Sequence, residues 1–261
     1  MDAIEIVCAG RSLRVWTGGA GTPVLLLHGG WGGAAAYWGA IWPELVRSHR
    51  VIAPELPGIA ADFPDALPSY RAYAGVCAGI LDQLGVGPAI VCGNSLGAVI
   101  GWDMSLAYPP AVARLVMING YPPQPLPAAV TILSRFRPLR ALAEAALRRD
   151  FYSPRALAAA FSDPASVPDE IEANLRRAPD AMVANMFRLL LSADATGGLP
   201  SMPVTFVWGL ADRLPGLGRR DVAAGHGDLA GRHDCCWPAG TGTVRGTDGD
   251  RRRGGGCQNP L

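Results

Sequence analysis

The sequence predicts an α/β fold, with a doubly wound, mostly parallel sheet and an inserted set of helices. Short apolar runs alternate with stretches of helical spacing through residues 1–120. Strands that are apolar on both faces are typical of buried parallel sheets. Residues 121–199 contain only helical patterns, and sheet-like sequence resumes at residue 203. Strand–helix alternation therefore predicts the sheet, and the all-helical stretch between two strands is expected to form a cap over it.

Alternating or continuous apolar runs give the expected strands, which cover residues 4–7, 13–16, 23–27, 50–54, 89–92, 113–119 and 203–208. Helical spacing predicts helices over residues 34–46, 70–84 and 98–106, and in the insertion over 128–136, 139–149, 155–161, 169–177 and 181–192. Ser153-Pro154 has the serine cap and first-turn proline that commonly begin a helix.

Three segments follow from this pattern. Residues 1–120 and 200–215 are expected to form the core, and residues 121–199 the helical cap. Residues 216–261 are rich in glycine and arginine and poor in large aliphatic side chains, so we expect an aberrant or disordered segment. A final strand and helix of the core would then be missing or aberrant.

Composition limits the class of protein. The chain has 261 residues, a formal net charge of +1 and 49% hydrophobic residues, which favours a soluble globular protein over a nucleic-acid binder. No apolar run is long enough to span a bilayer, and residues 1–5 lack the basic start of a signal peptide, so we expect a cytoplasmic protein without a membrane partner. The six cysteines show no pairing or metal-binding spacing, and no phosphate-binding loop is present. We expect no metal or cofactor and a small-molecule substrate; the sequence leaves the oligomeric state open.

One stretch carries a chemical signature. Val91-Cys92-Gly93 ends an expected strand, and Asn94-Ser95-Leu96-Gly97 leads directly into helical spacing. A Gly-x-Ser-x-Gly turn between a strand and a helix holds its serine on a sharp, strained bend with the hydroxyl exposed. The flanking glycines are expected because backbone segments approach too closely there for a Cβ atom.

Four motifs in order extend this pattern. They are His28-Gly29-Gly30-Trp31, Glu55-Leu56-Pro57-Gly58, Gly93-Asn94-Ser95-Leu96-Gly97 and Trp208-Gly209-Leu210-Ala211-Asp212. Over roughly residues 4–213 the chain resembles the α/β-hydrolases with a helical cap, such as esterases, lactonases and carbon–carbon bond hydrolases. The resemblance implies an α/β-hydrolase fold and a serine nucleophile.

The resemblance also assigns roles. Ser95 would attack the substrate, and Asp212 would orient a histidine base. The backbone N–H groups of Leu96 and Gly30 would stabilise the oxyanion, with Trp31 as the alternative to Gly30.

The sequence offers two candidates for the base of the triad. Only His233 and His226 follow Asp212, and neither follows a recognisable strand; His233 has the better spacing and His226 is the alternative. His28 ends a buried strand and is expected to hold its loop by a hydrogen bond. Because apolar periodicity is lost soon after Asp212, we also consider a change of reading frame there, which translation of the gene in its other two frames would test.

Substrate contacts are expected from Trp31, Asn94, Phe136 and Met186. The main functional prediction is hydrolysis of small, largely apolar esters, lactones or related acyl compounds through an acyl-enzyme. The alternatives are a catalytically impaired, hydrolase-like binding protein without a proper histidine, a carbon–carbon bond hydrolase, and an acyltransferase. Labelling of Ser95 by a fluorophosphonate separates an active serine from the binding protein.

Overall fold

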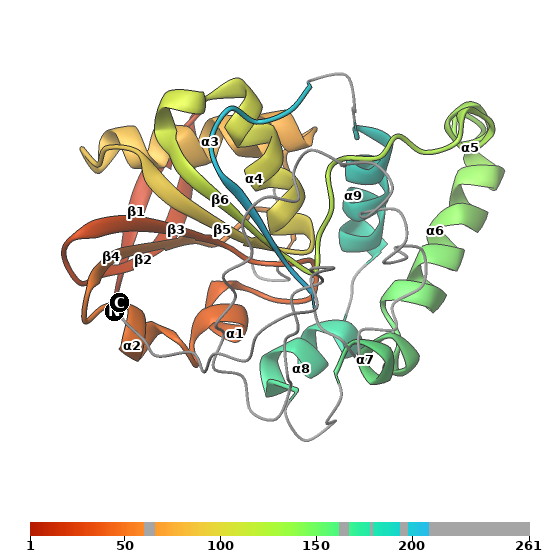
Figure 1. The fold of residues 1–261 in the computed structure, drawn as a ribbon. Helices are drawn as coiled ribbons and strands as arrows, with labels where there is room; N and C mark the ends of the chain where they lie inside the picture. Colours follow the sequence, from red (N-terminus) through yellow and green to blue (C-terminus); the bar gives the residue numbers. More distant parts are fainter. Residues whose placement is uncertain (60–65, 162–166, 178–179, 194–197, 209–261) are drawn as a thin grey trace, which may run out of the picture.

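The computed structural model describes residues 1–59, 66–161, 167–177, 180–193 and 198–208. Within these ranges the strands are β1 (Asp2–Cys8), β2 (Arg11–Gly18), β3 (Thr22–Leu27), β4 (His49–Pro54), β5 (Ala89–Asn94), β6 (Val112–Ile118) and β7 (Val204–Val207). They form one sheet in the order β1-β2-β4-β3-β5-β6-β7 (Figure 1). The pairs β1–β2 and β2–β4 are antiparallel, and all others are parallel. The predicted mostly parallel sheet is confirmed.

The helices within the sheet-forming part are α1 (Ala34–Trp38), α2 (Trp42–Leu45), α3 (Tyr70–Gln83) and α4 (Leu96–Ala107), followed by the short 3₁₀ turn η1 (Pro109–Ala111). The single helix expected over residues 34–46 is wrong, since two short helices occupy that stretch. Pro43 lies in the first turn of α2. In a continuous helix it would have no N–H to donate to the carbonyl of Gly39, and its ring would clash with that carbonyl. One continuous helix is therefore excluded.

Both faces of the central strands are buried, as their apolar runs predicted. In β3, Leu25 packs in a cluster with Ile80 of α3, whereas the next residue, Leu26, packs in a second cluster with Trp38 of α1. Alternate side chains of a strand point to opposite faces, so α3 and α4 cover one face and α1 the other. Helices on both faces make the sheet doubly wound.

Every regular element that the structure describes between β6 and β7 is a helix. Its helices are α5 (Ala128–Leu133), α6 (Arg137–Phe151), α7 (Pro154–Ala160), α8 (Asp169–Arg177) and α9 (Asp180–Leu191). Figure 1 shows them beyond one end of the sheet, with α5 and the beginning of α6 farthest from it. The helices that the sequence predicted here are confirmed, with ends shifted by a few residues.

A side-chain cap begins α3. The Ser69 hydroxyl accepts a hydrogen bond from the N–H of Ala72 at 3.2 Å, which satisfies one of the donors that a helix leaves unpaired at its start. Ser69→Ala removes this bond and should lower the free energy of unfolding by about 1 kcal/mol. Urea denaturation measures the change. The exposed Ser48→Ala serves as the control and should change stability by less than about 0.5 kcal/mol; equal effects would show that the cap contributes nothing.

Candidate active site

Ser95 occupies the bend between β5 and α4 with a strained backbone. Its φ of 51° and ψ of −110° lie outside the regions that L-amino acids ordinarily adopt. The N–H of Ser95 donates to the carbonyl of Ile118 in β6 at 2.8 Å, and its own carbonyl accepts from the N–H of Ala98 at 3.0 Å. Backbone hydrogen bonds on both sides hold the bend in place. The side chain is partly exposed.

Close backbone approach explains the two flanking glycines. A Cβ atom on Gly93 would lie 2.5 Å from the backbone nitrogen of Ala98. One on Gly97 would lie 2.6 Å from the carbonyl carbon of Leu27 and 2.8 Å from the carbonyl oxygen of His28. Backbone cannot move aside as a flexible side chain can, so α4 reaches the end of β3 only with glycine at position 97.

His28 holds the loop after β3, and both of its ring nitrogens form hydrogen bonds. It is fully buried, with Nδ1 2.8 Å from the carbonyl oxygen of Gly29 and Nε2 accepting from the N–H of Leu56 at 2.9 Å. Since a carbonyl accepts and an N–H donates, the ring carries its proton on Nδ1 and is neutral. Burial lowers the pKa of His28, although nearby Glu55 opposes this. The predicted loop-holding role is confirmed.

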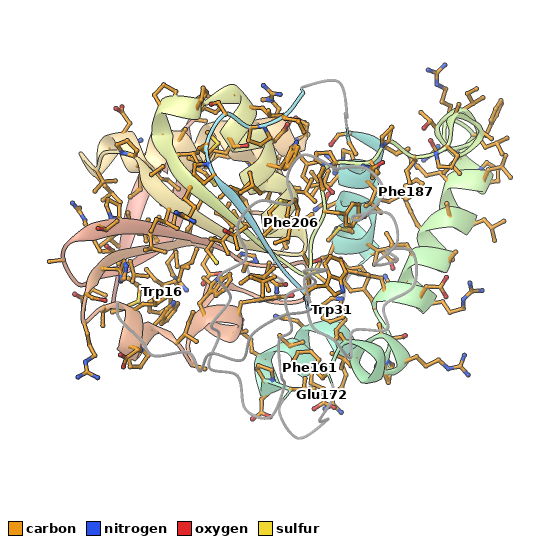
Figure 2. The ribbon with its side chains drawn as sticks, viewed as in Figure 1. Trp16, Trp31, Phe161, Glu172, Phe187 and Phe206 are labelled. Carbon is orange, nitrogen blue, oxygen red and sulfur yellow. The ribbon has the colours of Figure 1, made fainter. Side chains whose placement is uncertain are left out.

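The loop after His28 lies against the helices from the β6–β7 segment. The backbone N–H of Trp31 donates to the Tyr37 hydroxyl at 3.3 Å, and its indole N–H donates to the carbonyl of Phe151 at 3.0 Å. A Cβ atom on Gly30 would lie 2.5 Å from the Met186 methyl group and 3.4 Å from the Phe151 ring. Figure 2 shows Trp31 between the sheet and these helices. Gly30 therefore faces an apolar surface made by Phe151 at the end of α6 and Met186 in the middle of α9.

Glu55 supports the same loop and was assigned no role from the sequence. Its carboxylate is buried, with 6% of the residue exposed, and accepts from the Trp16 indole N–H at 2.7 Å. The other carboxylate oxygen accepts from the N–H of Ala34, the first residue of α1, at 2.9 Å. A negative charge at a helix N-terminus is favourable. The sequence did contain a signal for this role of Glu55. It is an acidic residue directly after a buried strand, at the same edge of the sheet as Ser95.

The predicted substrate contacts do not all lie together. Met186 is buried beside Gly30, Trp31 packs on Phe151 with ring centres 5.2 Å apart, and Asn94 ends β5 next to Ser95. Phe136 instead lies at the beginning of α6 with 60% of its surface exposed. The structure does not bring Phe136 to this site.

The predicted acid and both candidate bases, Asp212, His226 and His233, lie outside the described residues, as does the whole segment 216–261. Nevertheless, β7 leads toward the site. Val207 pairs with Ile118, which pairs with Asn94, so the carboxyl ends of β5, β6 and β7 share one edge of the sheet.

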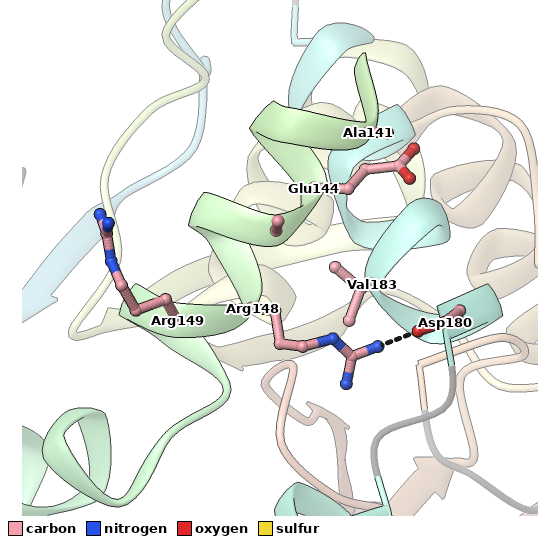
Figure 3. Close-up of a pocket in the computed structure, with 7 residues that line it drawn as sticks. Ala141, Glu144, Arg148, Arg149, Asp180 and Val183 are labelled. Atoms are coloured by element: carbon pink, nitrogen blue, oxygen red, sulfur yellow. Dashed lines mark hydrogen bonds and ion pairs between the residues drawn. The ribbon is translucent and has the colours of Figure 1, made fainter. Parts of the chain in front are cut away.

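A cavity of about 420 Å³ lies elsewhere, between α6 and α9 (Figure 3). Its walls carry mixed charges, including the Arg148–Asp180 ion pair at 2.5 Å. Its lining residues are Ala141, Glu144, Ala145, Arg148, Arg149, Asp180 and Val183. None of them is a predicted site residue, so we place the candidate site at Ser95.

Neither a metal site nor a membrane-spanning helix is found in the part of the chain that the structure describes. Among these residues, no group of three or more His, Cys, Asp or Glu side chains is arranged to hold a metal ion. None of the helices seen there combines the length and the apolar character needed to cross a bilayer.

Comparison with known proteins agrees with the observed sheet. A sequence profile described as the alpha/beta hydrolase family matches residues 24–240, most of the chain. The chain belongs to the alpha/beta hydrolase family. The matched range includes Ser95, Asp212, His226 and His233.

Individual relatives match to different extents. A 2-hydroxymuconate semialdehyde hydrolase of Pseudomonas sp. strain CF600 is 35% identical over 119 residues, covering 44% of this chain and 42% of that protein. A pimeloyl-(acyl-carrier protein) methyl ester esterase of Aromatoleum aromaticum is 31% identical over 206 residues, covering 74% of this chain and 80% of the esterase. For several curated relatives the match spans only about two fifths of their length.

Solved structures support the fold. An esterase from Thermogutta terrifontis superposes with a TM-score of 0.62 at 23% identity, covering 82% of this chain and 83% of the esterase. At this identity the likeness shows the shared fold alone.

The strain at Ser95 can be measured with two variants that both lack the hydroxyl. Alanine at φ 51° keeps the strain, whereas glycine adopts positive φ freely. Ser95→Gly should therefore be more stable than Ser95→Ala by about 1 kcal/mol. Paired urea denaturation curves measure the difference. An alanine variant as stable as the glycine variant would mean that the bend is relaxed.

Glu55→Gln tests the support of the loop. The amide keeps one acceptor oxygen but turns an NH₂ group toward either the Trp16 or the Ala34 N–H, so one buried donor loses its partner. We expect the free energy of unfolding to fall by about 1–3 kcal/mol in thermal or urea denaturation. Glu5→Gln, whose carboxylate contacts Ser12 and Arg14 at the surface, is the matched control and should cost less than about 1 kcal/mol. Similar losses in both would contradict a special role for Glu55.

Proposed function

We propose that the chain is a serine hydrolase that cleaves small, largely apolar esters, lactones or related acyl compounds. The observation that carries this proposal is the backbone of Ser95, held at φ 51° between β5 and α4 by hydrogen bonds to Ile118 and Ala98. A serine raised on such a bend presents its hydroxyl outward, while the first N–H groups of the next helix remain available to a ligand. The helices between β6 and β7 would form the cap.

In the proposed mechanism, Ser95 Oγ attacks the acyl carbon while a histidine takes the hydroxyl proton. His233 is the proposed base, with His226 as the alternative, and Asp212 would orient it. The tetrahedral intermediate expels the alcohol, which receives the proton from the histidine. Water, deprotonated by the same histidine, then cleaves the acyl-enzyme and releases the acid and free Ser95.

The oxyanion would be held by the N–H groups of Leu96 and Gly30. Leu96 is the first residue of α4, so its N–H has no partner within the helix. The alternative donor, Trp31, already donates its N–H to the Tyr37 hydroxyl, which favours Gly30. Each such donor typically contributes about 10²–10³-fold to turnover.

The surroundings of Gly30 favour an apolar acyl group. Met186 is 5% exposed and meets Gly30 through its methyl group, and the rings of Phe151 and Trp31 pack beside it. We propose Trp31, Met186 and Asn94 as substrate contacts. Phe136 is not retained, because its side chain is mostly solvent-exposed.

Carbon–carbon bond hydrolysis is a second candidate, because a relative 35% identical over 119 residues is a 2-hydroxymuconate semialdehyde hydrolase. The same serine could serve either reaction. A comparison of turnover on short p-nitrophenyl esters and on a vinylogous 1,5-diketone would decide between them.

A fluorophosphonate probe tests the nucleophile. The folded chain should be labelled at Ser95, as mapped by mass spectrometry, and Ser95→Ala should not be labelled. Loss of the true base should lower ester turnover by about 10⁴–10⁶-fold, so His233→Ala and His226→Ala, assayed in parallel, should differ sharply. A folded chain that resists labelling would instead favour the impaired, hydrolase-like binding protein.

A further inference from the structure

Large apolar side chains are exposed together at the outer end of the cap. Most of the exposed large hydrophobic residues in the described ranges fall within residues 132–142. They are Ile132 (55% exposed), Leu133 (48%), Phe136 (60%), Leu139 (41%) and Leu142 (68%). Contiguous exposed apolar surface on a folded protein commonly marks a place where something binds. We call these five residues the apolar ridge.

Local geometry keeps the ridge together. The N–H of Phe136 donates to the carbonyl of Leu133 at 3.0 Å, and this bond closes a tight turn between α5 and α6. Leu139 and Leu142 are three residues apart in α6 and are therefore neighbours on its surface, and Phe136 is the residue that directly precedes the helix. Figures 1 and 2 show α5 and the upper part of α6, with side chains standing off them, at the outer edge of the molecule.

The charged side chains among the ridge residues are all positive. Arg135, Arg137 and Arg140 are interleaved with its apolar residues and are exposed. The sequence contains no Asp or Glu between Asp103 and Glu144, and Glu144 is 3.6 Å from Arg140. Within the described part of the chain, no carboxylate forms an ion pair with Arg135 or Arg137. The ridge is therefore both apolar and cationic.

From this combination we infer that the apolar ridge docks the chain onto an anionic lipid surface. An amphipathic helix with Leu and Phe on one face and Arg beside them lies at a bilayer interface, where its apolar side chains enter the acyl boundary and its arginines meet anionic headgroups. The composition predicted no membrane partner because no run is long enough to span a bilayer. Peripheral docking needs only an exposed apolar face.

Other occupants fit the ridge less well. A second copy of this chain, related by a two-fold axis, would bring the same arginines against one another. A specific protein interface usually carries about ten hydrogen bonds. Apart from arginines, residues 131–142 offer only Thr131 and Ser134 as polar side chains, and the Ser134 hydroxyl already donates to the Thr131 carbonyl at 2.8 Å.

Vesicle co-sedimentation of the full chain tests the inference, independently of any activity of Ser95. The chain should sediment with vesicles of phosphatidylcholine and phosphatidylglycerol, less with phosphatidylcholine alone, and less at high salt. Leu142→Asp should abolish sedimentation, whereas Leu199→Asp should not; Leu199 is 60% exposed and lies between α9 and β7, outside the ridge. Arg135→Gln and Arg137→Gln should each weaken binding about fivefold. Thermal denaturation confirms that the variants fold.

Three outcomes would overturn the inference. The first is no sedimentation with the anionic vesicles at low salt. The second is equal sedimentation of the Leu142→Asp and Leu199→Asp variants. The third is a stable dimer in light scattering that Leu142→Asp dissociates, because the ridge would then be covered by a second copy.

Discussion

The backbone contact between the beginning of α4 and the end of β3 is the constraint on which the site depends. Gly97 lets α4 approach the carbonyls of Leu27 and His28 at a distance that leaves no room for a Cβ atom. This approach places the bend at Ser95 next to the loop that carries Gly30. The proposed nucleophile and the proposed oxyanion donors thus directly follow two strands that are neighbours in the sheet, β5 and β3.

Buried hydrogen bonds made by Glu55 and Leu56 also support the loop after β3. The Glu55 carboxylate joins Trp16 of β2 to Ala34 of α1, and His28 joins the loop to Leu56. Buried polar groups of this kind are favourable only when all are paired. Glu55 and Leu56, which directly follow β4, therefore hold the two ends of the Gly29–Gly33 loop through Ala34 and His28, while Trp16 of β2 orients the Glu55 carboxylate.

The proposed cap has two surfaces of different character. Met186 and Phe151 face inward to Gly30 and would define an apolar substrate site. The ridge formed by α5 and the beginning of α6 faces outward, with apolar and arginine side chains interleaved. If both proposals hold, a hydrolase of apolar esters would be held at the surface where such molecules concentrate.

The sequence by itself determined the elements whose causes are local. Apolar runs placed the strands, the serine between two glycines placed the bend, and Ser153-Pro154 marked the beginning of α7. Only the tertiary structure decided which residues meet. Trp16 and Glu55 are 39 residues apart and Trp31 and Phe151 are 120 apart, so no local pattern predicts their hydrogen bonds. Phe136 shows the same limit: helical spacing makes an apolar residue a candidate for burial, but whether it is buried depends on what packs against that face.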